Sequence, residues 1–414
     1  MVELIHKAAL IIEVIKGRIK RILKRIYFKI MEIIYFNSRT WISDDYTIKK
    51  VGLIENSETF FGYYDKYPEN KEGTHILFHR TYLSTRYKPN PEEPVEIVLF
   101  NKKNNKEKVV GQTTAYNWQQ GARLMWLDNK SFIFNIFDKE FSSIKYCISN
   151  NKSTRYPFTI NDSFGDEFSL TLNYSRLNKV RPDYGYQNID SQADLDDDKD
   201  GIFLNDHFSK TQRLLISIES LKQKVHKRYH EYDHWVNHIM ISPDGSKFMF
   251  IHRWAYKSAK RHDLLYLYDL KTNSLELLSK FGMVSHMNWI TNKEIFGFLK
   301  GPVGNGYYSI DLTNKELSLS KIFRQKTDGH PTICAQYAIT DCYPNKKRMK
   351  NLFHYSFKND LTSHIGSFKE STIFWGPTRC DLHPRLSDNS DIIYFDSVHE
   401  GFRRMYLLAP IKQC

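Results

Sequence analysis

A short strand–turn–strand unit recurs along this chain and limits the folds that it can adopt. The clearest copy spans residues 237–254, where a Ser-Pro-Asp-Gly turn joins two apolar runs. Proline presets the backbone angle φ, aspartate bonds the local backbone and glycine accepts a positive φ, so this tetrapeptide forms a tight turn. Seven copies begin near Asp65, Arg123, Leu172, His238, His286, His330 and His383, at intervals of about 44 to 70 residues. Such a period is typical of β-propeller blades.

The repeat predicts an all-β fold, a seven-bladed β-propeller over residues 46–414, with six or eight blades as alternatives. The composition agrees, because 27 Phe and 26 Tyr, together with Ile and Val, favour strands. The last copy has room for only three strands before the chain ends, whereas residues 46–54 precede the first copy and lack a blade. We expect this segment to be the outer strand of the last blade and to close the ring, since an open ring leaves two unpaired strand edges.

The first 40 residues predict a separate unit, a basic amphipathic helix. Over residues 4–36, isoleucine and leucine recur at steps of three and four, which places them on one helical face. Residues 1–40 hold nine Lys and Arg against three Glu, nearly half of the net charge of +13. The apolar runs are shorter than the roughly 18–20 residues that span a bilayer. This pattern suits an anionic membrane surface, with docking on the protein's own domain or on a partner as the alternative.

Other sequence features exclude several classes of function. The remainder of the chain is only mildly basic, so we expect no nucleic-acid partner. The five cysteines lack framework spacing and no Cys-x-x-Cys is present, which favours a reducing compartment and argues against a zinc ribbon. With the basic helix, this predicts a cytoplasmic protein peripheral to the inner face of the membrane. No P-loop, Gly-x-Gly-x-x-Gly or Gly-x-Ser-x-Gly element is present, so a conventional α/β nucleotide-sugar site is not expected.

A histidine stands at the start of four of the seven copies. These are His238, His286, His330 and His383. In a propeller the first strand of each blade lines the central channel, so residues just before it gather at one mouth. Convergent neutral imidazoles bind divalent transition metals such as manganese. The alternative is that each histidine caps a strand by bonding the backbone of a neighbouring blade. In the same register, Arg123 occupies the second copy and Asp65 the first.

Several segments carry further, longer motifs. They read Phe-Gly-Tyr-Tyr-Asp-Lys-Tyr-Pro from residue 61, Asn-Trp-Gln-Gln-Gly-Ala-Arg from 117, Arg-Pro-Asp-Tyr-Gly-Tyr from 181, Asp-Gly-His-Pro from 328 and Cys-Asp-Leu-His-Pro-Arg from 380. These motifs resemble the blade signatures of bacterial TolB-like propellers, close to the oligogalacturonate-lyase-like group, over about residues 58–410. The resemblance implies a propeller that cleaves uronic-acid glycans by β-elimination at a histidine-rich, metal-containing channel mouth.

The resemblance also implies roles for individual residues. In β-elimination a cation neutralises the carboxylate beside the acidic C–H, a base removes the proton, and an acid can protonate the leaving oxygen. The candidate metal ligands are His286, His330 and His383, and the candidate base or acid is His238. A guanidinium grips a carboxylate through its planar fork. Arg123 and Arg253 are therefore candidates for catalysis, and Arg379 is a candidate for substrate binding.

Polar-tipped aromatic side chains near the predicted blade mouths complete the candidate set. Tyrosine and tryptophan rings stack on sugars and donate hydrogen bonds. Trp118, Tyr184 and Tyr186 are therefore candidate substrate-binding residues, with Asp65 as a polar neighbour. The alternative for each ring is packing between blades.

Together these features predict a propeller that acts on an acidic surface polysaccharide or oligosaccharide, as a metal-assisted lyase or another sugar-acting enzyme. Two alternatives stay open. One is a non-catalytic scaffold or glycan-binding protein in capsule or exopolysaccharide biosynthesis. The other is a noncanonical glycosyltransferase, which would bind a nucleotide sugar.

Overall fold

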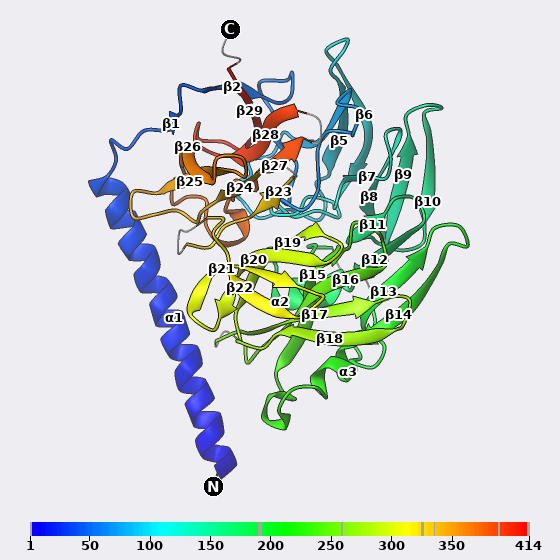
Figure 1. Ribbon diagram of the computed structural model, residues 1–414, viewed down its shortest axis with the longest axis vertical. Helices are drawn as coiled ribbons and strands as arrows, with labels where there is room; N and C mark the ends of the chain where they lie inside the picture. The colour runs from blue at the N-terminus through cyan, green and yellow to red at the C-terminus, as the bar shows by residue number, and fades with distance from the viewer. Residues whose placement is uncertain are drawn as a thin grey trace.

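A computed structural model of the chain shows seven antiparallel sheets arranged around a central axis (Figure 1). It describes residues 2–188, 193–257, 260–323, 327–334, 336–387 and 390–411, with the backbone alone for residues 2–10 and 390. The predicted seven-bladed β-propeller is confirmed. The last residues of the predicted propeller range, 412–414, lie outside the described part.

The first four blades follow the chain in order. The first contains β3 (Glu58–Phe60), β4 (His75–Thr81), β5 (Val95–Asn101) and β6 (Lys106–Thr113), and the second β7 (Met125–Trp126), β8 (Ser131–Asp138), β9 (Glu140–Cys147) and β10 (Lys152–Tyr156). The third contains β11 (Asp162–Phe164), β12 (Phe168–Leu172), β13 (Gly201–Asp206) and β14 (Thr211–Ser217), and the fourth β15 (Asp233–Ile241), β16 (Lys247–Ala255), β17 (His262–Asp269) and β18 (Ser274–Ser279).

The last three blades complete the circle. The fifth contains β19 (Val284–Thr291), β20 (Glu294–Gly301), β21 (Gly304–Asp311) and β22 (Glu316–Leu319). The sixth contains β23 (Thr332–Ile333), β24 (Tyr337–Asp341), β25 (Met349–Ser356), β26 (Leu361–Lys369) and, as a fifth strand, β1 (Trp41–Ile42). The seventh contains β27 (Arg385–Ser387), β28 (Ser390–Ser397), β29 (Arg404–Pro410) and the N-terminal β2 (Tyr46–Lys50).

The N-terminal strand β2 lies in the last blade and covers residues 46–50 of the segment 46–54. It pairs antiparallel with β29, Tyr46 opposite Pro410 and Lys50 opposite Tyr406. The first and seventh blades also touch, because the carboxylate of Asp396 accepts hydrogen bonds from the backbone amides at residues 61 and 62. The two ends of the propeller sequence are therefore held together by strand pairing and by buried polar contacts.

Burial within a blade follows the position of each strand. The middle strand β16 is buried over almost its whole length, since neighbouring blades cover both of its faces, and its sequence is correspondingly apolar. The outer strand β6 is exposed or half-buried at all but its last residue, and most of its residues are polar. The turn between β15 and β16 forms as expected, with Ser242 donating to the side chain of Asp244 and Gly245 at φ +72°.

The third blade begins earlier than the repeat predicts. The sequence places its start near Leu172, whereas the structure starts it with β11 at Asp162, and Leu172 ends the second strand. Strand β11 has three residues and begins with Asp-Ser, and the turn after it contains no proline. It therefore lacks both the histidine and the Pro-Asp-Gly turn of the clearest copy. An insertion with helix α2 (Tyr174–Val180) then separates β12 from β13.

Short helices flank the blades, and one long helix precedes them. Helices α3 (Ile218–Lys222), η1 (Lys227–Tyr229) and η2 (Gly376–Thr378) lie in loops, while α1 (Val2–Ile34) runs along one side of the propeller (Figure 1). The predicted N-terminal helix is thus present. Among the described residues, no helix has an apolar stretch long enough to cross a bilayer.

Helix α1 contacts the propeller through the side opposite its apolar stripe. Glu32 accepts hydrogen bonds from Thr372, and the ring of Phe28 lies 5.9 Å from that of Trp375. In contrast, Ile19 and Ile26 of the stripe are about half exposed, at 51% and 50%. The protein's own domain therefore leaves the apolar stripe uncovered.

Candidate functional site

The four histidines of the shared register converge around one tyrosine. The ring centroids of His238 and His286 are 5.7 Å apart, those of His286 and His330 4.0 Å, and those of His330 and His383 4.3 Å. The Tyr63 ring lies 4.9 to 6.3 Å from all four. Circular repetition of the blades thus brings together side chains that are far apart in the sequence.

Local irregularities in the backbone occur at three of these four histidines. The pairing register shifts in β15 between residues 237 and 240, on either side of His238, and in β19 between residues 284 and 287, around His286. Such bulges re-aim a side chain. His238 and His383 also have positive φ, +53° and +44°. A positive φ in a non-glycine residue is uncommon and clusters at functional sites.

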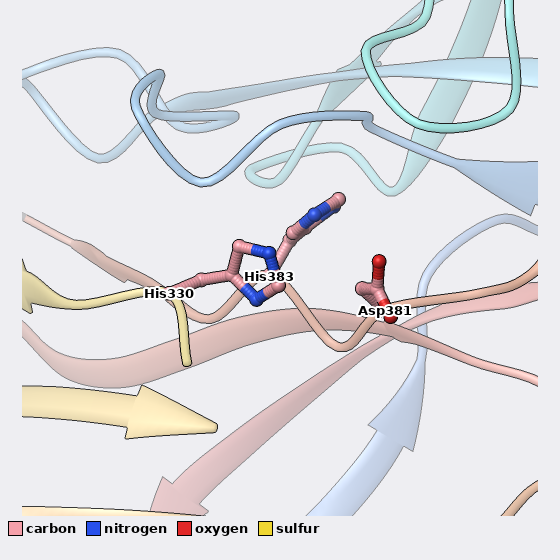
Figure 2. A group of neighbouring side chains, drawn as sticks. All are labelled: His330, Asp381 and His383. Carbon is pink, nitrogen blue, oxygen red and sulfur yellow. The ribbon is translucent and has the colours of Figure 1, made fainter. Parts of the chain in front are cut away.

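His330, His383 and Asp381 form a compact group that fits a metal ion (Figure 2). Their ligand atoms lie within 4.8 Å of one another, and all three side chains are buried. The Nδ1 of His330 donates to Asp341 at 2.8 Å, and the Nδ1 of His383 donates to the carbonyl oxygen of Gly62 at 2.8 Å. Within the described part of the chain neither Nε2 has a hydrogen-bond partner. Each imidazole therefore has one nitrogen fixed by the protein and the other available as a ligand.

Electrostatics keep the carboxylate of this group ionised. Burial disfavours a charged Asp381, but Lys350 and Arg379, at 3.2 and 2.8 Å, outweigh it and hold its pKa well below the usual range. Burial together with His330 lowers the pKa of His383 well below the usual value. For His330, burial is outweighed by Asp341, which raises the pKa. An anionic oxygen beside two imidazoles is a donor set suited to a divalent transition metal.

Asp341 holds both histidine segments in place. Its carboxylate accepts the backbone N–H of His330 at 2.8 Å and that of His383 at 3.2 Å, besides the Nδ1 of His330. One buried carboxylate at the end of β24 therefore sets the distance between two candidate ligands that belong to different blades.

His286, the third predicted ligand, lies next to this group but outside it. Its Nδ1 is 3.2 Å from Asp328 and 3.1 Å from the hydroxyl of Ser285. Burial and the neighbouring His330 lower its pKa. The structure therefore gives His286 a place beside the candidate ligands, while a carboxylate, Asp381, completes the compact group.

His238 pairs with the central tyrosine. Its Nδ1 is 3.0 Å from the hydroxyl of Tyr63, and either group can donate, depending on which ring nitrogen carries the proton. Burial and the charge of Arg253 lower the pKa of His238 well below the usual value, and burial raises the pKa of Tyr63. Both side chains are therefore neutral near pH 7. His238 is partly exposed, whereas the other three histidines are buried.

Two of the predicted substrate-binding residues border the histidine cluster. The ring of Tyr184 is 5.9 Å from Tyr63 and 5.8 Å from His238. Arg379 donates to Asp381 and, at 3.1 Å, to the hydroxyl of Tyr184. Tyr184 thus borders the pair of His238 and Tyr63, and Arg379 links Tyr184 to Asp381 of the candidate metal group. These are the two halves of the site.

Arg123, Asp65 and Arg253 use their charges inside the fold. Arg123 forms a bidentate ion pair with Asp65, in which its two terminal nitrogens donate to the two carboxylate oxygens at 2.7 and 3.1 Å. Both side chains are almost fully buried. Arg253 lies 3.1 Å from Asp263 and donates to the carbonyl of Val284 at 2.8 Å. The shared register placed Arg123 and Asp65 correctly near blade starts, but these two bind each other across blades.

Trp118 and Tyr186 also pack between elements. The indole N–H of Trp118 donates to the carbonyl of Tyr87, and its ring contacts Phe60 and Tyr116. The ring of Tyr186 is completely buried and stacks on another tyrosine at 4.2 Å. For these two aromatics the packing alternative describes the contacts that the structure shows.

Sequence reasoning missed Tyr63, Asp341 and Asp381 as members of the site. Asp381 stands two residues before His383 in the Cys-Asp-Leu-His motif, and Tyr63 lies in the Phe-Gly-Tyr-Tyr motif, so both were within quoted segments. Their spacing gave no sign of a contact with histidines of other blades.

Comparison with known proteins adds a structural likeness. No family model and no curated protein matches the sequence. An oligogalacturonate lyase in complex with manganese matches with a TM-score of 0.64 and 12% identity, over 90% of this chain and 96% of that one. The chain has the fold of oligogalacturonate lyase. A second oligogalacturonate lyase, from Vibrio parahaemolyticus, matches with a TM-score of 0.60 and 11% identity over the same shares, 90% and 96%. TolB from Acinetobacter baumannii matches over 77% of each chain at 11% identity, with a TM-score of 0.38.

Proposed function

We propose that the protein binds a divalent metal such as manganese at its channel mouth and acts there on an acidic glycan, by β-elimination at a uronic-acid residue. The observation that carries the proposal is a buried group of His330, His383 and Asp381 whose ligand atoms lie within 4.8 Å of one another, with both Nε2 atoms unpartnered among the residues that the structure describes. The likeness to an oligogalacturonate lyase in complex with manganese supports it. An acidic polysaccharide or oligosaccharide of the cell surface is the corresponding substrate class.

The proposed site divides the work between its two halves. His330, His383 and Asp381 would hold the cation, which when bound would neutralise the uronate carboxylate and so acidify the neighbouring C–H. His238 is the proposed base. With its Nδ1–H donating to the oxygen of Tyr63, the Nε2 of the neutral ring can accept the proton. Tyr184 and Arg379 border both halves and would orient the sugar.

The experiment uses protein purified without a histidine tag. Bound metal is measured by mass spectrometry, and oligouronates are screened for the rise in ultraviolet absorbance of an unsaturated product. We expect about one manganese per chain and product formation that Tyr63→Phe and His238→Ala reduce by roughly 10²- to 10⁴-fold, the usual contribution of acid–base catalysis. Protein that binds no manganese and forms no unsaturated product would refute the lyase proposal.

A non-catalytic glycan-binding propeller is the second candidate. The observation that favours it is the burial of the cluster, because His286, His330 and His383 are only 3%, 1% and 2% exposed. It predicts that alanine at His238, His330 and His383 leaves glycan binding intact. Binding of a nucleotide sugar in a calorimetric titration would instead support the transferase alternative.

We also propose that helix α1 attaches the protein to an anionic membrane surface. Its stripe of isoleucines faces away from the propeller and is exposed, and lysine and arginine flank the stripe. A basic helix with an exposed apolar face suits the boundary between lipid headgroups and acyl chains.

A further inference from the structure

A pocket of about 290 Å³ lies between helix α1 and the histidine cluster. Its lining includes Lys24, Phe28, Tyr343, Trp375, Arg379 and Asp381. Asp381 belongs both to this pocket and to the candidate metal group. The ring of Tyr343 lies 5.8 Å from that of His330. The pocket is therefore an extension of the proposed site toward the helix.

The walls of the pocket combine aromatic rings with charged side chains, among which Arg348 and Glu370 form an ion pair at 2.7 Å. Phe28 and Trp375 face each other across the helix–propeller contact, with ring centroids 5.9 Å apart. The ammonium of Lys24 lies 5.7 Å from the ring of Phe28 and has no carboxylate partner among the residues that the structure describes. Arg379, in contrast, is neutralised by Asp183 and Asp381. Aromatic faces beside one uncompensated ammonium suit a sugar that carries a carboxylate.

The same helix sets the distance of the pocket from the proposed membrane surface. Lys24 and Phe28 lie on the side of α1 that contacts the propeller, whereas Ile19 and Ile26 lie on the exposed side. A helix with its side chains is about 10 Å across. When the isoleucine stripe rests in the lipid boundary, the pocket is therefore about one helix diameter from that boundary.

We propose that this pocket binds a uronic-acid headgroup that remains attached to a membrane lipid. The inference rests on the proposed acidic-glycan function and names the form in which the substrate arrives. Enzyme and substrate on one surface meet at a raised effective concentration, which compensates for weak contacts with a single sugar. A soluble oligouronate gains nothing from the exposed stripe of α1.

The test compares two kinds of phosphatidylcholine vesicle. One contains glucuronosyl diacylglycerol, and the other contains phosphatidylglycerol at the same mole fraction, so that both vesicles carry the same negative charge. Flotation should show about tenfold tighter binding to the glucuronosyl vesicles, a difference of roughly 1.4 kcal/mol. Lys24→Gln should abolish this preference, while Lys20→Gln on the same helix, whose side chain does not line the pocket, should retain it. Free methyl glucuronide should compete only at concentrations far above that of the lipid.

Two outcomes would overturn the inference. One is equal affinity of the unmodified protein for both vesicles, and the other is an intact preference in Lys24→Gln. Neither outcome depends on metal or turnover, so the lyase proposal is judged separately by its own assay. Full competition by dilute methyl glucuronide would show that the pocket takes soluble sugars instead.

Discussion

At the scale of single residues, Asp341 positions the two candidate histidine ligands of the proposed metal site. It fixes the Nδ1 of His330 and the backbone of both candidate histidines. Removing a partner that orients a ligand typically weakens metal binding by roughly 10- to 100-fold. We expect Asp341→Asn to weaken manganese affinity by about that factor in a calorimetric titration. Asp263→Asn is the matched control, since Asp263 is equally buried and also holds a backbone amide, that of Val284, in another blade. Equal affinities in the two variants would contradict this assignment.

The buried pair of Asp65 and Arg123 predicts how stability depends on pH. Burial disfavours ionised Asp65, but Arg123 and Lys66 outweigh it and lower its pKa to about 2. The unfolded chain, with a pKa near 3.9, binds this proton first as the pH falls, so stability is lost from about pH 4 down to about pH 2. That loss should be on the order of 2 to 3 kcal/mol in urea unfolding.

Asp65→Asn should flatten this acid loss while lowering the free energy of unfolding at pH 7 by roughly 3 to 5 kcal/mol, because Arg123 is then buried without its partner. Metal content should not change, since the pair belongs to packing. Asp44→Asn, at an exposed position, is the control and should leave both values unchanged. An acid profile in Asp65→Asn identical to that of the unmodified protein would refute the pairing.

Residues differ in how far the sequence predicts them. The four histidines were predictable because the repeat gives each the same place in its blade, and a shared place in a propeller implies convergence. Arg123 and Asp65 share that register, yet they pair with each other. Asp341 stands at the end of a strand with no motif around it. Its contacts cross two blades, and no local pattern records such contacts.

At the scale of elements, strand β2 predicts the effect of N-terminal truncation. It covers the edge of β29, and Ile48 packs against the core of the last blades. Deleting residues 1–51 removes that cover and exposes a strand edge that can pair with another chain. We expect this variant to melt several degrees lower and to aggregate on heating, whereas deletion of residues 1–40, which keeps β2, should melt close to the full-length protein. Calorimetry with light scattering measures both, and equal behaviour of the two truncations would contradict a role for β2.

The element scale also shows where the repeat fails as a guide. Blades that begin with a histidine were placed correctly because turn and periodicity agree. The third blade has an inner strand of three residues and an insertion between its second and third strands. The start of this blade also carries neither a histidine nor a Pro-Asp-Gly turn, so its predicted start was displaced to Leu172.

At the scale of the whole molecule, helix α1 sets how the propeller is presented to a surface. Its exposed stripe and its basic flanks predict binding that has an apolar part and a salt-dependent part. The full-length protein should cosediment with phosphatidylglycerol vesicles and should bind less tightly at high salt. Burying two isoleucine side chains contributes roughly 3 kcal/mol or more, so Ile19→Asp with Ile26→Asp should weaken binding at least about 100-fold.

Ile19→Val with Ile26→Val is the matched control and should keep most of the affinity, since both positions stay apolar. Deletion of residues 1–40 should abolish binding without unfolding the propeller. A second copy of the chain is the competing occupant of the stripe, and it predicts a dimer by sedimentation that the aspartate substitutions dissociate. A dimer of the unmodified protein that does not bind the vesicles would therefore assign the stripe to self-association and would separate the histidine mouth from any lipid surface.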